Sequence, residues 1–361
     1  MARWPPAEPA IHVTSRGELA ALPCGERGTH RDAFDEARRM PNASPLPDDL
    51  RGGPFSVSDA QSRGVTRSRL RASDLYAPFH GTRLPSASTS LRQRCMAWQS
   101  IAPADSYVSH STAALLFGCP LPRRLETTKD IHVTVVRPRR PPRASRVVGH
   151  SVGAGRATPI NSRGLRMSTA EQTWLELGTQ LDFLELVAAG DYLLRGFREP
   201  NGTRRPFTTV RRLRDAAAAH RGRRHRKMID RALDAVRERV DSPKETELRL
   251  LLQTAGFPEL IVNEPVRDDT GRVLACPDLR VRGYNLGIEY KGFVHATSHD
   301  AWENDIRRER NLDDIDWKTI DVMRSDLKQP HHIILVIERE LQKRGWTGSS
   351  TWPGLHYEPE A

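Results

Sequence analysis

The clearest pattern of apolar and polar positions lies between residues 273 and 290. Two short runs rich in β-forming residues are separated there by the turn residues 283–285, an arrangement that predicts a β-hairpin. Residues that face each other in a hairpin lie at equal distances along the chain from its loop. Asp278 and Glu289 meet this condition for a two-residue loop at Gly283 and Tyr284. The pattern therefore predicts two carboxylates opposite each other on one face of a sheet.

Lys291 adds an amine to the same face, because side chains two residues apart on a strand point the same way. Two carboxylates with room for water suit a hard divalent cation, which favours Mg²⁺, with Mn²⁺ as the alternative. Such a cation polarises a phosphate and lowers the pKa of a bound water, and an ammonium group steadies developing charge. The resulting hypothesis is a metal-dependent site for nucleic-acid cleavage.

Two plainer interpretations compete with this hypothesis. Glu289 and Lys291 are also typical of a solvated strand face, and Asp278 is a common residue for capping a turn. The neighbours Ile288 and Gly292 favour the site, since they indicate a core strand that ends at a close backbone approach, where unused charges are costly.

The segments around the hairpin predict a small mixed sheet flanked by helices. The pattern begins with a helix that has Pro243 at its first position and ends at Gly256, followed by a strand around Ile261. After the hairpin come a helix over about 298–312, a strand over 317–323 and a final helix over 332–344. The predicted order is α-β-β-β-α-β-α.

Glu245 lies on the edge of the apolar stripe of the first of these helices, from where its carboxylate can reach the hairpin site. Ser242, three residues earlier, provides a second explanation for the same Glu, because Ser and Glu at this spacing form a capping box. Both interpretations stay open.

Residues 55–85 predict a helix, a turn, a second helix and a wing. The first helix starts at Ser58, Gly64 marks the turn, Thr66 caps the second helix, and His80 with Gly81 marks a turn in the extended segment. This order is typical of a winged helix-turn-helix that binds DNA, although a solvated helical hairpin has the same pattern. The arginines expected to contact DNA are Arg67, Arg69, Arg71 and Arg83.

Residues 91–200 predict a mixed α+β domain, with a helix from Ser109 or Ser111 to Gly118, a strand over 131–136 and two helices over 168–195, the first opened by a capping box of Ser168 and Glu171. His110 and His132 have no partner at motif spacing and are expected to be structural. Asp191 is expected to be a cap or an ion-pair member. Residues 205–240 are helical and basic, either a phosphate-tracking face or a connector.

Composition changes the picture mainly through charge. The 361 residues contain 56 Lys and Arg against 45 Asp and Glu, a net charge of +11, which favours a polyanionic partner such as DNA or another nucleic acid. No apolar run is long enough to span a membrane and no signal peptide begins the chain, so we expect a cytoplasmic protein without a membrane partner. The four cysteines show neither zinc-site nor disulfide spacing, and a homodimer is left open.

The expected class is α/β, with six segments along the chain. They are a disordered basic extension (1–50), the winged helix-turn-helix-like segment (51–90), the mixed α+β domain (91–200), the basic helical connector (201–240), the domain around the hairpin (241–346) and a flexible tail (347–361).

Residues 241–346 resemble the PD-(D/E)xK nuclease superfamily, the restriction-endonuclease-like fold, and more narrowly its very-short-patch-repair-endonuclease-like domains. The resemblance implies that Asp278 and Glu289 bind the metal, that Lys291 positions water or phosphate and that Glu245 supports the site. Many relatives of this subgroup carry Asp where Lys291 stands, which leaves the role of that position uncertain. It also implies that His295 is a base or a phosphate contact, and that Asp305 and Arg308 are supporting residues. The matching residues are Glu245, Pro277, Asp278, Glu289, Tyr290, Lys291, Gly292, His295, Asp305 and Arg308.

Residues 55–200 are similar to AbiEi-type antitoxin proteins, with a winged helix followed by a mixed domain. The resemblance rests on GVTRSRL, SHSTAALLFG and IHVTV, and implies a DNA-binding regulator. The leading hypothesis for the whole chain is a DNA-binding protein with a Mg²⁺-dependent endonuclease-like domain that hydrolyses phosphodiester bonds. The alternative is a non-enzymatic transcriptional regulator or antitoxin that uses a degenerate nuclease fold for binding.

Overall fold

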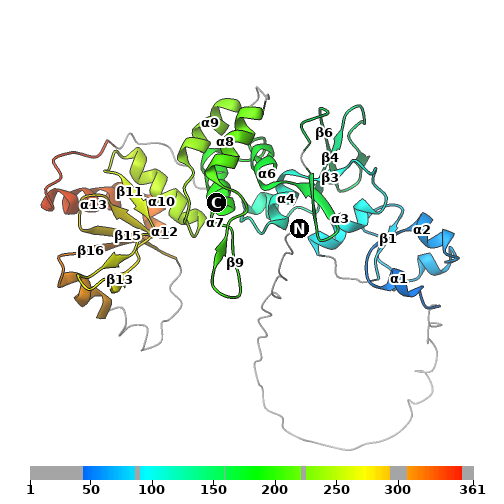
Figure 1. Cartoon of the computed structure of the whole chain (residues 1–361), viewed down its shortest axis with the longest axis horizontal. Coiled ribbons are helices and arrows are strands. Elements are labelled where there is room, and N and C mark those ends of the chain that lie inside the picture. The colour runs from blue at the N-terminus through cyan, green and yellow to red at the C-terminus, as the bar shows by residue number, and fades with distance from the viewer. Residues whose placement is uncertain (1–43, 86–89, 158, 221–224, 293–306, 352–361) are drawn as a thin grey trace, which may run out of the picture. The chain divides into compact units, whose positions relative to one another are not determined.

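The structure, a computed structural model, describes residues 44–85, 90–157, 159–220, 225–292 and 307–351 (Figure 1). The chain divides into two compact units, Met1–Ser88 and Thr89–Ala361, which we describe separately. The described residues form both helices and sheets, which confirms the α/β class in its broad sense.

The first unit is a small fold around a core of apolar residues that includes Leu46, Leu50 and Phe55. Residues 46–50 therefore belong to the folded part of this unit, although the sequence placed them in the disordered extension. Ser56 caps α2 by accepting the N–H of Asp59 at 3.0 Å. The elements are α1 (Asp48–Arg51), β1 (Phe55–Ser56), α2 (Val57–Ser62), the 3₁₀ helix η1 (Arg69–Arg71) and β2 (Thr82–Arg83).

The second helix predicted for this unit is shorter in the structure than the sequence indicates. Thr66 accepts the N–H of Arg69 at 3.2 Å as a cap should, but only the single turn η1 follows. Leu70 and Leu75 both enter the core, and residues five apart do not share a helical face, so the chain leaves the helix at Ala72 to bury both. The turns are where the sequence predicts them, at Gly64 and at residues 79–82, and β2 pairs with β1.

The second unit begins with a six-stranded sheet in the order β5-β6-β4-β3-β8-β7. Its centre is β4 (Ile131–Val136), the strand that the sequence predicts at these residues, and β4 runs parallel to β6 (Val147–Val152). Helix α4 (His110–Leu116) starts after Ser109, and Gly118 follows it with φ +78°. The other elements are α3 (Leu91–Gln99), β3 (Tyr107–Val108), α5 (Arg123–Glu126), β5 (Arg143–Ala144), β7 (Pro159–Ser162) and β8 (Leu165–Ser168).

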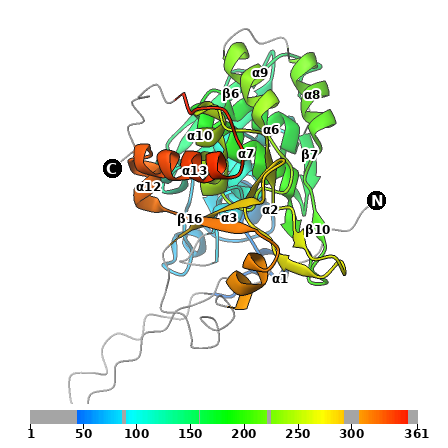
Figure 2. The same ribbon diagram turned by 90° about the vertical axis from the view of Figure 1, so that its left-hand side faces the viewer.

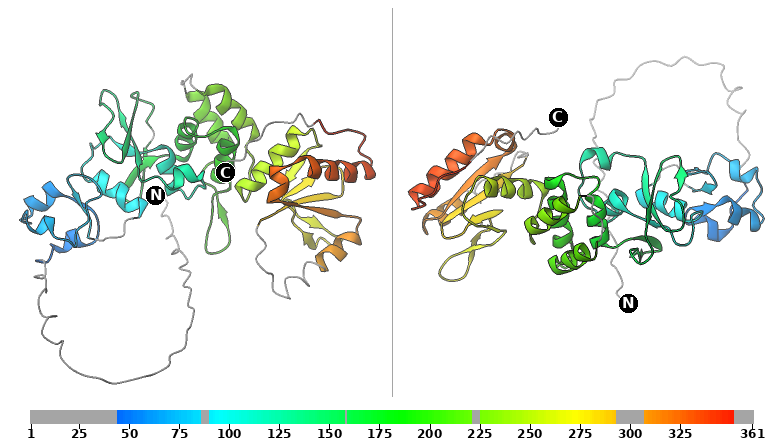
Figure 3. Two further views of the ribbon diagram at one scale, coloured as in Figure 1. Left: turned by 180° about the vertical axis from the view of Figure 1, so that it is seen from behind. Right: turned by 90° about the horizontal axis from the view of Figure 1, so that it is seen from above.

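Four helices follow and share one apolar core with α4. They are α6 (Ala170–Leu177), α7 (Phe183–Arg195), α8 (Val210–Ala219) and α9 (Arg226–Ala235), and Figure 3 shows them gathered in green, with a hairpin of β9 (Phe197–Arg198) and β10 (Arg204–Arg205) extending from them. Leu213 and Ile229 are fully buried in this core, so the basic segment expected as a connector packs as part of it.

The predicted cap of α6 is displaced by one residue. Thr169, rather than Ser168, accepts the N–H at the helix start, from Gln172 at 3.2 Å. The hydroxyl of Ser168 instead donates to Oε2 of Glu176 at 2.9 Å, a buried acceptor that competes successfully for it. The longest described helices, α7 and α13, have 13 residues each, and no described helix combines the length and apolar character that crossing a bilayer requires.

The C-terminal part is a four-stranded sheet in the order β11-β14-β15-β16. Figure 2 shows α10 and α13 over one face, where their leucines and isoleucines share a core with the strands. Residues 307–313 are helical, the described end of the helix predicted over 298–312. The elements are α10 (Pro243–Thr254), β11 (Leu260–Val262), β14 (Leu279–Val281), β15 (Leu286–Lys291), β16 (Lys318–Met323), α12 (Arg324–Lys328) and α13 (His331–Lys343).

The start of the predicted hairpin, at residues 273–275, belongs to a different sheet. Val273 and Leu274 lie in β13 (Val273–Ala275), which pairs with β12 (Val266–Arg267) as a separate two-stranded sheet. Pro277 separates β13 from β14, because proline has no N–H for a ladder hydrogen bond. The hairpin that carries the candidate site is therefore shorter than predicted, and consists of β14 and β15 alone.

Candidate active site

The register of β14 and β15 places the two carboxylates as the sequence predicts. Leu279 pairs with Ile288 and Arg280 with Gly287, so Asp278 and Glu289 are the next residues facing each other at the open end of the hairpin. The turn spans residues 282–285 rather than two residues. Its end residues form hydrogen bonds with other segments: the N–H of Arg282 donates to Glu259 O at 2.8 Å, and Asn285 O accepts from Lys318 at 3.1 Å.

Asp278 is bound to the opposite strand through its side chain. Its Oδ2 accepts the N–H of Tyr290 at 2.7 Å, which continues the ladder beyond the last backbone pair. Burial raises the pKa of Asp278 to about 6, and the negative charges of Glu245 and Glu289 add to this, while the Tyr290 N–H and Lys291 act in the opposite direction. The aspartate thus lies in a crowded, negatively charged environment.

Glu289 is more deeply buried, with 6 % of its surface exposed. Its Oε2 accepts from Lys291 Nζ at 2.5 Å and from Arg308 at 3.0 Å. Burial acts to raise the pKa of Glu289, but the hydrogen bonds from Lys291 and Arg308 outweigh it and hold the pKa below its usual value. Its Oε1 is buried and has no hydrogen-bond partner among the described residues.

Asp321 joins the site, and the sequence reasoning missed it. In the parallel pair of β15 and β16, Asp321 lies directly beside Glu289, and its Oδ1 lies 3.8 Å from Lys291 Nζ. Asp321 and Arg308 also line a pocket of about 360 Å³ that continues to Trp317. The available signal was the strand over 317–323, but its parallel register with β15 does not follow from local spacing.

Glu245 makes one of the two contacts of the predicted capping box, and its side chain binds the N–H of Asp241 instead of that of Ser242. Ser242 Oγ accepts the Glu245 N–H at 3.2 Å, while Glu245 Oε2 accepts the N–H of Asp241 at 2.8 Å and the amide of Asn263 at 3.0 Å. Glu245 is also near enough to influence the pKa of Asp278. Both interpretations of this residue therefore have a physical basis.

The remaining predicted residues of the C-terminal site divide into two groups. Arg308 forms an ion pair with Glu289 at 3.0 Å. His295 and Asp305 lie outside the described residues.

Two of the four arginines predicted to contact DNA hold the first unit together instead. Arg69 forms a bidentate pair with Asp74 at 2.8 and 2.7 Å and also donates to Ser44 O. Arg83 donates to Leu70 O at 2.5 Å. Arg67 and Arg71 are exposed and remain accessible to a polyanion.

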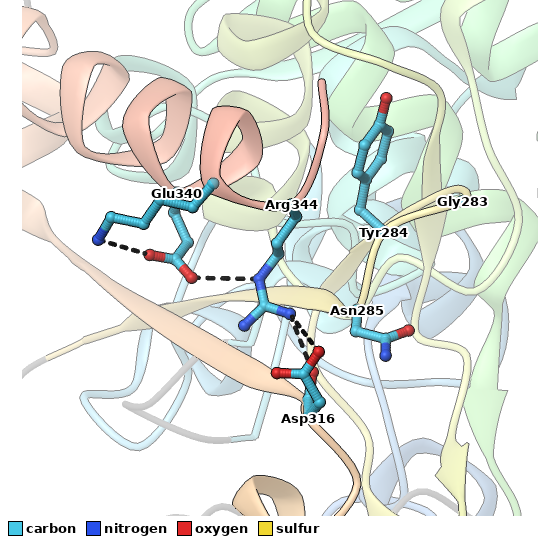
Figure 4. Close-up of a pocket in the computed structure, with 7 residues that line it drawn as sticks. Gly283, Tyr284, Asn285, Asp316, Glu340 and Arg344 are labelled. Atoms are coloured by element: carbon cyan, nitrogen blue, oxygen red, sulfur yellow. Dashed lines mark hydrogen bonds and ion pairs between the residues drawn. The ribbon is translucent and has the colours of Figure 1, made fainter. Parts of the chain in front are cut away.

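A second pocket lies at the opposite end of β15 from Glu289. Figure 4 shows it between the turn residues Gly283–Asn285 and the end of α13, with a volume of about 450 Å³. Arg344 extends into it and is held by Glu340 at 3.1 Å and by Asp316 O at 2.9 Å. Because internal partners neutralise its charges and the carboxylate pair is at the other end of the strands, it forms no part of the candidate active site.

Comparison of the chain with known proteins found no matching family model, no matching curated protein and no matching solved structure. The assignment of the site therefore rests on the residues and their geometry.

Proposed function

We propose that the four-stranded sheet carries a Mg²⁺-dependent nuclease centre that hydrolyses phosphodiester bonds of DNA, in a domain of the PD-(D/E)xK kind that the sequence resembles. The observation that supports this most strongly is Glu289 Oε1, a buried carboxylate oxygen without a hydrogen-bond partner among the described residues. Leaving such an atom unsatisfied is costly, so a buried oxygen of this kind next to a second carboxylate fits a metal ligand.

The donor set suits the proposed cation. Asp278 and Glu289 would hold Mg²⁺ through one oxygen each, with Asp321 beside them, and hard oxygen donors with space for water are what Mg²⁺ prefers. When bound there, Mg²⁺ polarises a phosphate and lowers the pKa of a bound water.

Lys291 and Arg308 supply positive charge at the same point. Both bind Glu289 Oε2, which fixes the carboxylate, and Arg308 also lines the pocket of about 360 Å³. An ammonium and a guanidinium held there stabilise charge that develops on a phosphate. Lys291 is also close to Asp321, so its amine is oriented from two sides.

DNA is the proposed substrate because the chain is strongly basic, with a net charge of +11. In the first unit, the exposed Arg67 and Arg71 are the residues proposed to contact phosphates. Each phosphate contact contributes about 0.9 to the slope of log affinity against log salt concentration, so replacing either arginine by alanine is expected to reduce the slope by about one.

One observation favours the alternative of a non-enzymatic regulator or antitoxin. Lys291 and Arg308 already neutralise Glu289, as they would in a nuclease fold retained only as a binding platform. Such a protein protects its own promoter in a footprint and cleaves no DNA with any divalent metal.

Plasmid nicking with and without Mg²⁺ decides between the two. The test compares the wild type with Asp278→Asn, which keeps the side-chain shape, and with Asp314→Asn, an exposed control. The proposal expects Mg²⁺-dependent nicking in the wild type and the control, and loss of it in Asp278→Asn. Equal nicking by all three proteins attributes the activity to another site or a contaminant, and the absence of nicking in all three favours the alternative.

A further inference from the structure

Three histidines from separate segments converge in the six-stranded sheet of the second unit. His110 is the first residue of α4, His132 lies on β4 and His150 lies on the neighbouring parallel strand β6. One ligand atom from each lies within 4.8 Å of the other two. The sequence predicts His110 and His132 to be structural, and the structure places both in a cluster with His150, which no local spacing indicates.

The rings are in direct contact. His132 Nδ1 lies 2.9 Å from His150 Nε2, and the rings of His110 and His150 stack with centroids 3.7 Å apart. The other nitrogens of two rings have fixed partners: His132 Nε2 lies 3.2 Å from the amide nitrogen of Gln180, and His110 Nδ1 lies 2.9 Å from Ser109 Oγ. Gln180 Oε1 accepts the N–H of Ser111, so the Gln180 amide nitrogen donates to His132 Nε2 and the ring proton lies on Nδ1, facing His150. Binding a metal ion through His132 Nδ1 therefore requires this proton to leave Nδ1.

Burial disfavours the protonated form of all three imidazoles and lowers their pKa values. His110 and His132 are buried, while His150 is half-buried and gives the cluster a route to solvent.

The backbone at His110 is strained in a way that serves the cluster. Its φ is +54°, in the left-handed region that is unfavourable for a residue with a Cβ. The buried Glu176 holds this conformation, because its Oε2 accepts the His110 N–H at 2.9 Å. Strain of this kind is concentrated at functional sites, where surrounding contacts maintain it.

We propose that His110, His132 and His150 form a binding site for a divalent transition-metal ion, with Zn²⁺ as the best fit. Three imidazole nitrogens are a common zinc ligand set, and they leave a fourth position for water or a small ligand. A tetrahedral ion with Zn–N distances of about 2.0–2.1 Å places its nitrogens roughly 3.3 Å apart, so the ligand atoms, which lie within 4.8 Å of one another, must adjust and the stacked rings must turn toward one point. Mg²⁺ prefers oxygen and is not expected here. The site is independent of the proposed nuclease centre.

Metal titration of the full, tag-free chain tests the proposal. After treatment with a chelator, the protein is titrated with Zn²⁺ against a chromophoric competitor, and with Co²⁺ while the visible spectrum is recorded. We expect one tightly bound Zn²⁺ per chain and the intense visible absorption of tetrahedral Co²⁺. Loss of an orienting partner alone lowers metal affinity by about 10–100-fold, so His150→Gln, which removes a ligand, is expected to lower it by at least about 100-fold.

Two matched variants separate this site from other sources of zinc binding. His332→Gln changes an exposed histidine on α13 and should leave the affinity unchanged, and Asp278→Asn should do the same. His132→Gln is the second ligand variant, and far-UV circular dichroism establishes that each variant is folded. The proposal is overturned if folded His150→Gln and His132→Gln bind Zn²⁺ like the wild type, if Asp278→Asn abolishes the binding, or if the wild type shows no saturable binding.

Discussion

The two large sheets of the second unit each bring polar groups together on a pair of parallel strands, but they assemble them differently. Beside β16, the strand β15 carries Glu289 and Lys291, and the adjoining hairpin supplies Asp278. Beside β6, the strand β4 carries His132, while His110 comes from a helix. The carboxylate group is thus mostly local in sequence, whereas the histidine cluster joins three distant segments.

The chemistry differs along with the assembly. The carboxylate site combines hard oxygen donors with two cations, and its charges interact strongly. The histidine cluster is formed by imidazole rings whose pKa values burial lowers. If both proposals hold, one chain binds an oxygen-preferring ion in one sheet and a nitrogen-preferring ion in the other, and variants at one site leave the other intact.

The largest expected effect is on nicking activity. Glu289→Gln removes the charge of the central carboxylate, so Lys291 and Arg308 lose their negatively charged partner. We expect Mg²⁺-dependent nicking to fall at least about 100-fold, since one such electrostatic group contributes several kcal/mol to the barrier. Initial rates at saturating Mg²⁺ measure this. His150→Gln should nick like the wild type, and a comparable loss in that variant would mean that the two regions form one functional centre.

The next largest effect is on stability, through a buried ion pair that joins α7 to α10. Asp191 on α7 and Arg249 on α10 form an ion pair at 2.9 Å with both side chains almost fully buried. Asp191→Asn leaves a buried guanidinium without its counter-charge, and we expect it to lower the free energy of unfolding by about 3–5 kcal/mol. Denaturant titration measures the change, with the exposed Asp234→Asn as control. A loss below about 1 kcal/mol would show that the pair contributes little to stability.

Much of the carboxylate site can be predicted from the sequence, because the residues that determine it are close together along the chain. The register of Asp278 and Glu289 follows from alternation and a turn, and the helix from Pro243 follows from its cap. The position of Asp321 beside Glu289 is not predicted, because the register of two parallel strands depends on the whole connection between them and not on a spacing between residues 291 and 321.

The second region illustrates the opposite case. The strand over 131–136 and the helix from His110 are predicted, but the contact of His132 with His150 depends on how two strands align across a loop.

In the first unit, the turns are predicted, whereas the length of the second helix is not, because the burial of Leu70 and Leu75 decides it. Tertiary packing overrides local propensity at such points.

Glu176, which binds the backbone of His110, is expected to make the free energy of unfolding depend on pH. Burial raises the pKa of Glu176 to about 7, so between about pH 4.5 and pH 7 the folded state binds more protons than the unfolded state. The stability that this carboxyl contributes is full below pH 4.5 and is lost as the pH rises through 7. Glu176→Gln does not ionise, so its free energy of unfolding relative to the wild type should increase by about 1–3 kcal/mol across this range.

Unfolding titrations at several pH values, with a chelator present, measure this difference. The exposed Glu238→Gln should follow the wild type at every pH. A difference between Glu176→Gln and the wild type that does not vary with pH would mean that Glu176 titrates as it does in the unfolded chain.

The smallest effect concerns Glu245, for which capping and support of the site both have a physical basis. Glu245→Gln keeps an oxygen that can accept the Asp241 N–H, so stability should change by less than the cost of about 1 kcal/mol expected for Ser242→Ala, which removes the cap. The variant also removes a negative charge that lies near enough to Asp278 to attract a cation bound there. We therefore expect Mg²⁺ affinity to weaken a few-fold, measured as a smaller metal-linked rise in melting temperature. An unchanged Mg²⁺ affinity would assign Glu245 to the helix cap alone, and the carboxylate region would then consist only of residues from its own sheet.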